Sequence, residues 1–316
     1  MEEKKPYTQL EVAKIIGEPK DPRKPFSNLI SAICEVDSAT PEEYVYYFDA
    51  LLETDKVYIS QASAVTQENV SPDTPAAMTF YDVTSPEYYV KFTDLISAKE
   101  AVLARKLATI NRAMNAYENY KLITLLSAGV QSGNNHDLDS GTTTFDYEKM
   151  IDMLDGIKDY GDNYTLVAGT AIDKDIILWD WTDNKYHSLK DAFADLNVDV
   201  QRVNQLVTID GTPTSVLAST VAYLVSKDSE MGKPLIVVRK KLDSLKLLGG
   251  VISQDGTMPE RLVFSSPNPI TLTGVARYLA VGLTGFEEFA SALTNPYAIA
   301  KFTRSEVYAN SGTQNV

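Results

Sequence analysis

The residue types that most often carry catalysis are scarce in this chain of 316 residues. It has two histidines, His136 and His187, and one cysteine, Cys34. Both histidines stand among polar residues, which predicts solvated imidazoles in loops. Cys34 stands in the apolar run LISAICEV, which predicts a buried, inert thiol rather than a nucleophile. A single cysteine also excludes an intramolecular disulfide and a thiolate zinc cluster.

Motifs for nucleotide or acyl chemistry are also missing from the sequence. Gly156 and Gly161 have the spacing of a phosphate-binding loop, but Asp162 follows where a lysine is needed. The patterns GxGxxG, GxSxG and HExxH do not occur. Neighbouring carboxylates are expected by chance among 43 acidic residues, and none stands where two pKa values would be driven apart. We therefore predict no enzyme activity, with no catalytic residue, no cofactor and no metal site.

Composition narrows the class of protein further. The net charge is −14, hydrophobic residues make up 44% of the chain, and no apolar run is long enough to span a bilayer. The beginning, MEEKKPYTQLEV, lacks the apolar stretch of a secretory signal. We expect a soluble acidic protein of a reducing compartment. Its 18 tyrosines suit either contact surfaces or an ordinary tyrosine-rich core and surface.

Charge is unevenly distributed along the sequence. Residues 131–200 hold 15 acidic residues and five lysines, a net of −10, whereas residues 231–304 hold nine cations and five acids, a net of +4. Such a division suits head-to-tail association between copies by charge complementarity. Uneven solvation with no partner is the alternative.

The strongest structural signal lies between residues 92 and 128, where neither glycine nor proline occurs. Leu107, Ile110 and Met114 follow helical spacing and define one apolar face. The sequence predicts a single helix, ending near Gly129 and roughly 55 Å long at 1.5 Å per residue. We expect that apolar face to pack on the rest of the chain.

Ahead of this helix, the sequence predicts two extended segments. Residues 1–50, with KDPRKPFSNL, favour an N-terminal arm, with a helix expected in YVYYFDALLE. Residues 51–91 predict a long β-hairpin with strands KVYISQASAV and AAMTFYDV around a proline-containing turn. An ordinary edge hairpin is the alternative to a projecting one.

Helical and strand patterns alternate irregularly after residue 145. FDYEKMIDMLDGIKDY predicts an amphipathic helix leading into a buried strand, NYTLVAG. DIILWDW predicts a strand and SLKDAFADL a helix. Because no regular βαβ repeat is present, the fold class is α+β.

This order of elements resembles that of the major capsid proteins of tailed bacteriophages, which share the Hong Kong 97-type fold. The segment KEAVLARKLATINRAMNAYENYKLITLLSAG is similar to the spine helix of that family, and RYLAVGLTGFEEFASALTNPYAIAKFTRSEVYA is similar to its closing portion. The resemblance implies an N-terminal arm at 1–50 and an extended β-hairpin loop at 51–91. It also implies a peripheral domain at 92–145 and 280–316, and an axial domain at 146–279.

The resemblance further implies a structural role. The expected function is that of a major capsid (head) protein, which self-assembles into pentamers and hexamers and forms an icosahedral shell around double-stranded DNA. Its partners would be many copies of itself, scaffolding, portal and decoration proteins, and packaged DNA, with no membrane. Its place would be the virion capsid, assembled in the host cytoplasm. An encapsulin-like cellular compartment shell and a soluble α+β enzyme are the alternatives.

Contact with DNA would be weak and non-specific because the chain is acidic overall. We expect it at Lys20, Arg23 and Lys24, which form a dense cationic cluster on the arm.

Overall fold

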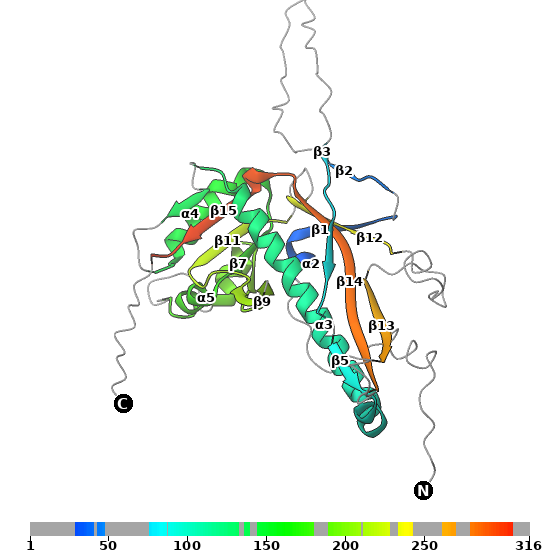
Figure 1. The fold of residues 1–316 in the computed structure, drawn as a ribbon. Coiled ribbons are helices and arrows are strands. Elements are labelled where there is room, and N and C mark those ends of the chain that lie inside the picture. The colour runs from blue at the N-terminus through cyan, green and yellow to red at the C-terminus, as the bar shows by residue number, and fades with distance from the viewer. Residues whose placement is uncertain are drawn as a thin grey trace, which may run out of the picture.

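Two β-sheets flank one long helix, α3 (Phe92–Gly129), in this computed structural model (Figure 1). The structure describes residues 29–40, 43–47, 76–86, 88–132, 136–139, 144–179, 189–209, 211–227, 233–242, 261–269 and 279–305. The fold class is α+β, as predicted.

The long helix is present as the sequence predicts. It has 38 residues, beginning at Phe92 and ending at Gly129. Leu107, Ile110 and Met114 are buried, which confirms the predicted apolar face. A Cβ added at Gly285 would lie 2.5 Å from Ile110 Cγ2, so this face packs directly on the strand that holds Gly285.

The larger sheet has six strands. Four of them follow the order β1 (Cys34–Ala39), β12 (Leu235–Lys240), β14 (Leu279–Leu293) and β13 (Arg261–Pro269). β4 (Tyr81–Thr84) and β5 (Tyr88–Lys91) also pair with β14. β1 is parallel to β12, and the other pairs are antiparallel. The 15-residue β14 therefore holds four other strands together.

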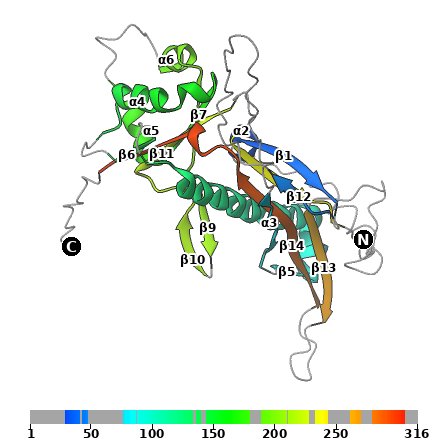
Figure 2. The same cartoon turned by 90° about the horizontal axis from the view of Figure 1, so that it is seen from above.

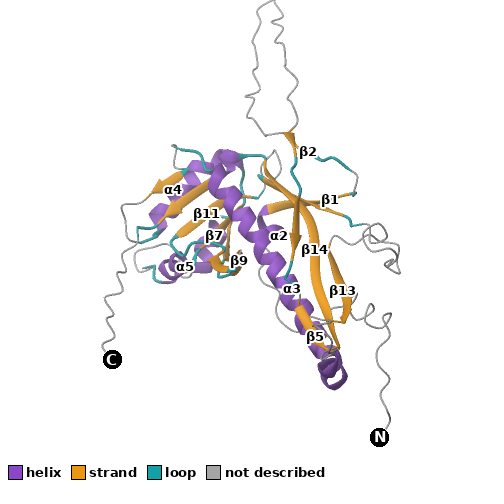
Figure 3. Cartoon of the chain, in the orientation of Figure 1, coloured by secondary structure: helices purple, strands orange, loops and turns teal. Residues whose placement is uncertain are grey.

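The smaller sheet has five strands in the order β6 (Asp137–Asp139), β15 (Ile299–Thr303), β11 (Val221–Ser226), β7 (Tyr164–Ala168) and β8 (Val198–Arg202). Its helices are α4 (Tyr147–Ile157), α5 (Thr170–Ile177) and α6 (Leu189–Asp195). α4 and α5 lie at this sheet in Figure 3, and all three helices are labelled in Figure 2. Every residue of β7 is buried. The helix and strand predicted over 145–169 are thus confirmed as α4 and β7, and the helix predicted at SLKDAFADL as α6.

Two short strand pairs complete the fold. β2 (Tyr46–Tyr47) pairs with β3 (Ala76–Ala77), and β9 (Leu206–Ile209) pairs with β10 (Thr212–Ser215). The second pair forms a hairpin beside α3, where Asn119 Nδ2 donates to Gln205 Oε1 at 2.9 Å (Figure 2). Its turn contains Gly211 with φ +82°, a backbone conformation that glycine adopts without strain.

Two predicted elements are wrong. The run DIILWDW is not a strand, because Asp175–Ile177 are the last turn of α5, whose buried residues Ile172 and Ile176 are spaced as on a helix face. The helix expected in YVYYFDALLE is not formed at Tyr46–Tyr47, which pair as strand β2 with β3. In both places a short apolar run fitted either conformation, and non-local pairing or packing decided between them.

The segments expected to extend from the body are described only in part. Within the expected arm, helix α2 (Leu29–Ile33) and β1 are packed, and Leu29, Ile30 and Ile33 are buried. Within the expected hairpin, AAMTFYDV supplies β3 and most of β4, and β4 pairs with β14. The other strand, KVYISQASAV, lies outside the described residues.

Strand pairing crosses the domain boundaries that the resemblance implies. β12 and β13 fall within 146–279, yet both pair with β14 in the six-stranded sheet. β15 falls within 280–316, yet it pairs with β11 in the five-stranded sheet. The chain therefore passes between the two sheets more than once, and the division at residue 280 stays a prediction.

Candidate functional site

The cationic cluster predicted to face DNA, Lys20, Arg23 and Lys24, lies outside the described residues, as does His187. The structure does place Cys34, His136 and several paired carboxylates.

His136 is buried rather than solvated, so that prediction is wrong. Its side chain is 4% exposed, and its Nδ1 lies 3.0 Å from the carbonyl oxygen of Ile299. The rings of Tyr160 and Tyr297 lie at centroid distances of 6.4 Å and 6.2 Å. The polar neighbours of His136 in sequence gave no sign of this burial, because the two tyrosines come from distant segments. The contacts make His136 part of the packing beside β15.

Cys34 is buried at the start of β1, as predicted. Burial raises the pKa of the Cys34 thiol far above its ordinary value, and the nearby Lys233 ammonium offsets only part of that rise. Because the thiolate is the reactive form, this thiol is inert in the folded chain.

The neighbouring carboxylates serve structural ion pairs. Asp173 Oδ1 lies 2.8 Å from Arg202 Nε. Asp175 is buried, with Oδ1 3.3 Å from Arg304 Nη1 and Oδ2 accepting from the backbone N–H of Phe145 at 2.9 Å. These contacts tie α5 to β8, to the end of β15 and to the start of α4. They leave no pair of carboxylates facing a common space for acid–base work.

The cations of the basic stretch 231–304 are largely engaged within the chain. Arg239 forms a two-pronged pair with Glu118 of α3, with distances of 2.9 Å and 3.1 Å. The other pairs are Lys240 with Glu288, Lys301 with Asp137, and Arg304 with Asp175. Four of the described cations in this stretch are therefore neutralised within the chain, and the head-to-tail interpretation of the charge distribution stays a prediction.

A different cationic surface lies along the border between α3 and strands β4 and β5. Lys121 Nζ lies 5.1 Å from the ring centroid of Tyr81 and 5.5 Å from that of Tyr117. Lys106 Nζ lies 5.5 Å from the ring centroid of Tyr88. We call these five residues the lysine–tyrosine face. Cation–π contact holds both ammonium groups on aromatic rings that are themselves partly exposed.

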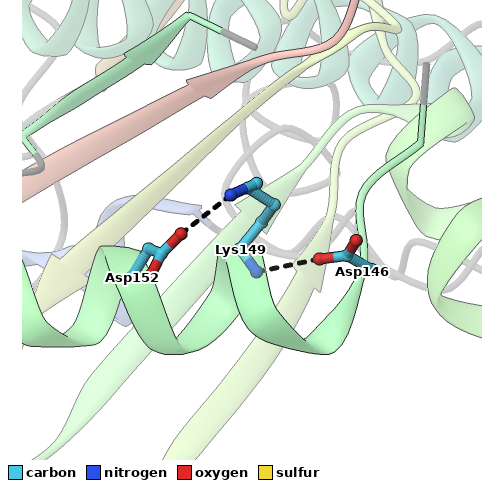
Figure 4. Close-up of polar contacts among 3 residues, drawn as sticks. All are labelled: Asp146, Lys149 and Asp152. Carbon is cyan, nitrogen blue, oxygen red and sulfur yellow. Dashed lines mark hydrogen bonds and ion pairs between the residues drawn. The ribbon is translucent and has the colours of Figure 1, made fainter. Parts of the chain in front are cut away.

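An acidic surface lies on the outward side of α4. Glu148, Asp152, Asp155 and Asp159 follow spacings of four, three and four, opposite the buried Met150, Met153 and Ile157. We call these four carboxylates the acidic face. Asp146 caps the helix by accepting from the Lys149 N–H at 2.9 Å, and Lys149 Nζ donates to Asp152 at 2.9 Å (Figure 4). Its hydrogen bond to Asp155 raises the pKa of Lys158, so both flanking lysines stay charged.

α3 packs closely on β14 around Gly285, where hydrogen bonds and apolar contacts lie side by side. Ser85 stands between β4 and β5 and pairs with Gly285 through its backbone, with N–H to O at 2.9 Å. The hydroxyl of Ser85 also accepts from the Gly285 N–H at 2.8 Å. Ser85 thus continues the pairing across the break between the two strands, and the missing side chain at Gly285 admits Ile110 and Met114 of α3.

Within the described part of the chain, no group of three or more metal-ligating side chains comes together. No helix among the described residues is long and apolar enough to cross a membrane.

Comparison with known proteins decides the fold. No protein-family model matches the chain, and no curated protein matches it in sequence. Solved structures do match. The capsid of an empty GTA particle aligns with a TM-score of 0.57 at 9% identity, over 92% of this chain and 94% of that one. The chain has the Hong Kong 97-type capsid fold.

Other shell structures share this capsid fold with the chain. The capsid of cyanophage P-SCSP1u aligns with a TM-score of 0.53 at 7% identity, over 91% of each chain. The virus-like particle from Pyrococcus furiosus aligns with a TM-score of 0.51 at 8% identity, over 92% of this chain and 95% of that one. The likeness extends over nearly the whole of each protein, so the capsid fold accounts for both sheets and the long helix together.

Proposed function

We propose that the chain is a major capsid protein, which self-assembles into pentamers and hexamers that form an icosahedral shell around double-stranded DNA. The observation that carries the proposal is the capsid fold over more than nine-tenths of the chain. The chemistry of the described residues agrees with a structural role, because its buried acids and its thiol serve packing and ion pairs.

The exposed surface supports a role in contact between copies. Tyr44, Tyr46 and Tyr81 are exposed on or beside short strands, as are Val36 on β1 and Leu206 on β9. Tyrosine is enriched where proteins meet, since it offers large contact area at low conformational cost. Each of these strands lies at the margin of a sheet, where another copy has access.

The proposed domain organisation follows the fold. Residues 1–50 form the N-terminal arm and 51–91 the extended loop. The peripheral domain comprises 92–145 and 280–316, and the axial domain comprises 146–279. Within this organisation, β12 and β13 pair with β14 of the peripheral domain, and β15 pairs with β11 of the axial domain, so strand pairing would join the two domains.

Other partners follow from this role. Scaffolding, portal and decoration proteins would meet the assembled shell, and packaged DNA would touch Lys20, Arg23 and Lys24 without sequence preference. The shell would be part of the virion, assembled in the host cytoplasm. If the arm faces DNA, Lys20→Gln, Arg23→Gln and Lys24→Gln together should lower DNA retention in particles while any sequence preference stays absent. Base-specific binding by the isolated chain would contradict this.

Electron microscopy and sedimentation of the native material test the main proposal. A capsid protein gives large closed particles, filled with DNA or emptied of it. Native material that sediments only as monomers or dimers, at every salt concentration, would overturn the proposal, as an enzyme of this fold class would behave in that way.

A cellular compartment shell is the second candidate. It is favoured by the match to a virus-like particle from Pyrococcus furiosus, over 92% of this chain. Small uniform cages that enclose protein and no DNA, in place of DNA-filled heads, would select this candidate.

A further inference from the structure

We propose that the lysine–tyrosine face of α3 in one copy binds the acidic face of α4 in a second copy. The inference rests on the proposed function, since it names the surfaces through which neighbouring copies meet. The two faces lie on different parts of the chain, so the contact is head-to-tail, and repetition of such a contact closes rings of copies.

The lysine–tyrosine face carries the positive charges of Lys106 and Lys121. Among the side chains that the structure describes on α3, from Arg105 to Gly129, the one acid is Glu118. Glu118 is 1% exposed and is paired with Arg239. Among the described side chains of α3, the one acid is therefore already neutralised by a partner other than Lys106 or Lys121.

The aromatic rings prepare the two lysines for binding, because they hold the ammonium groups in place. Lys121 lies over Tyr81 and Tyr117, and Lys106 lies over Tyr88, so the flexible lysine side chains are partly ordered before any contact forms. The tyrosines add contact area and hydroxyl groups that donate to carboxylates. Tyr81 is 44% exposed, which leaves its ring available to a second copy.

The acidic face is opposite in charge to this surface and spans about three quarters of its length. Lys106 and Lys121 are 15 residues apart on one helix, about 22 Å at 1.5 Å per residue. Glu148 and Asp159 are 11 residues apart along α4 and the turn that follows it, about 16 Å. Ile151 lies among these carboxylates and is 37% exposed, which offers an apolar contact to the tyrosine rings.

Protein is favoured over nucleic acid as the occupant of the lysine–tyrosine face. The chain carries a net charge of −14, which opposes phosphate binding over most of its surface. The acidic residues behind this net charge include those of the acidic face on α4, which every copy carries. Since surface charges are screened by salt, assembly that depends on this contact should weaken as ionic strength rises.

Charge reversal in the full chain tests the contact. Lys106→Glu with Lys121→Glu should raise the protein concentration needed for half-maximal particle assembly at least about tenfold, because like charges then face each other. Adding Glu148→Lys and Asp155→Lys to the same chain should restore assembly to within about threefold of the original, since opposite charges again meet. Assembly is measured by sedimentation velocity and by particle counts in electron micrographs.

Matched controls separate the contact from a general loss of charge or stability. Lys174→Glu with Lys241→Glu makes the same change in net charge outside both faces and should leave assembly near that of the original chain. Thermal melting of the dissociated subunits should be similar for all variants. If the reversal variant is insoluble, Lys106→Gln with Lys121→Gln replaces it. This neutral variant should lose less assembly than the reversal variant. Glu148→Gln with Asp155→Gln, on the acidic face, should lose assembly to a similar extent.

Three results would overturn the inference. The first is assembly of the reversal variant at the concentration that the original chain needs. The second is failure of the variant with all four substitutions to restore assembly. The third is normal particles of the reversal variant that lack DNA. The last result would place nucleic acid on the lysine–tyrosine face. Failure of the unaltered chain to form particles under any condition would instead refute the proposed function itself.

Discussion

The two sheets differ in how completely the chain itself covers their faces. In the five-stranded sheet, Leu166 and Leu224 join an apolar cluster with α4, α5 and α6, while Val167 and Val225 join a second cluster with α3. Both faces are therefore covered, and every residue of β7 is buried. In the six-stranded sheet, burial alternates along β14. Leu283, Gly285, Glu287 and Phe289 are buried, whereas Thr284, Phe286 and Glu288 are only half-buried.

This difference indicates which sheet is covered by the chain itself and which sheet has surface left for contact with another copy. A sheet with two covered faces gains its apolar burial from its own helices. The six-stranded sheet gains it from α3 on one face and, at one end of the other face, from a smaller apolar cluster that contains Val238, Ala290 and Ala292. Edge strand β1 carries three exposed residues in succession. In the proposed shell, the six-stranded sheet is accordingly the side that a neighbouring copy covers. Mutations that separate the two sheets test this distinction.

The largest expected effect comes from the contact between α3 and β14. Ile110→Asp places a charge where Ile110 Cγ2 now packs toward Gly285, and a buried, unpaired carboxylate is far too costly for a marginally stable fold. We expect no soluble chain. The adjacent Thr109→Asp changes the outward side of the same turn and should yield soluble protein. Normal assembly by Ile110→Asp would show that the buried face of α3 is placed incorrectly.

Next in size is the ion pair that fastens β12 to the long helix. Arg239→Met leaves the Glu118 carboxylate buried without its partner and should lower the free energy of unfolding by about 3–5 kcal/mol. Lys240→Met is the matched control on the same strand. Its partner Glu288 is 23% exposed, so the expected loss is about 1 kcal/mol or less. Urea unfolding of dissociated subunits measures both, and equal losses would contradict the assigned burial.

Local patterns predicted the elements that depend on local contacts. The helix expected over about 92–128 matches α3, and the amphipathic helix expected in FDYEKMIDMLDGIKDY contains α4. Both helices satisfy their own backbone hydrogen bonds, so periodicity is sufficient. The same reasoning found the inert Cys34, because its apolar neighbours in sequence are also its neighbours in space.

Prediction failed where distant segments decide the structure. His136 is buried by Tyr160 and Tyr297, which no pattern around His136 contains. β4 and β5 pair with β14 some 200 residues away, and the cations of 231–304 find partners as distant as Glu118. The lysine–tyrosine face was missed for this reason, since Tyr81 and Lys121 meet only in the folded chain.

Glycine substitutions sharpen the comparison of the two sheets by the kind of atom that each Cβ would meet. At Gly169, between β7 and α5, a Cβ would lie 2.3 Å from the backbone oxygen of Ala218. At Gly285, on β14, it would meet the side chains of Ile110 and Met114 at 2.5 Å and 2.7 Å. Side chains move more readily than paired backbone. Gly169→Ala should therefore cost about 3 kcal/mol or more and Gly285→Ala about 1–3 kcal/mol.

Thermal melting of the dissociated subunits measures both glycine changes. Gly211→Ala is the control for backbone conformation alone, because a Cβ there meets nothing within 4 Å although φ is +82°. It should cost about 1 kcal/mol. A larger loss for Gly285→Ala than for Gly169→Ala would mean that the six-stranded sheet is the more rigid of the two.

The smallest effect concerns Cys34, the buried first residue of edge strand β1. Its reactivity measures whether β1 stays paired at the edge of the six-stranded sheet. In the folded chain the thiol should react with iodoacetamide at least about a hundredfold more slowly than in denaturant, since burial suppresses the thiolate. Above the ordinary thiol pKa of 9.0, only the unfolded chain releases this proton. The free energy of unfolding should then fall as pH rises, by up to about 1.4 kcal/mol per pH unit from this group. Cys34→Ala should lack that part of the slope. Rapid alkylation of the native chain would show that β1 opens readily, and the six-stranded sheet would then be exposed at its edge as well as on its face.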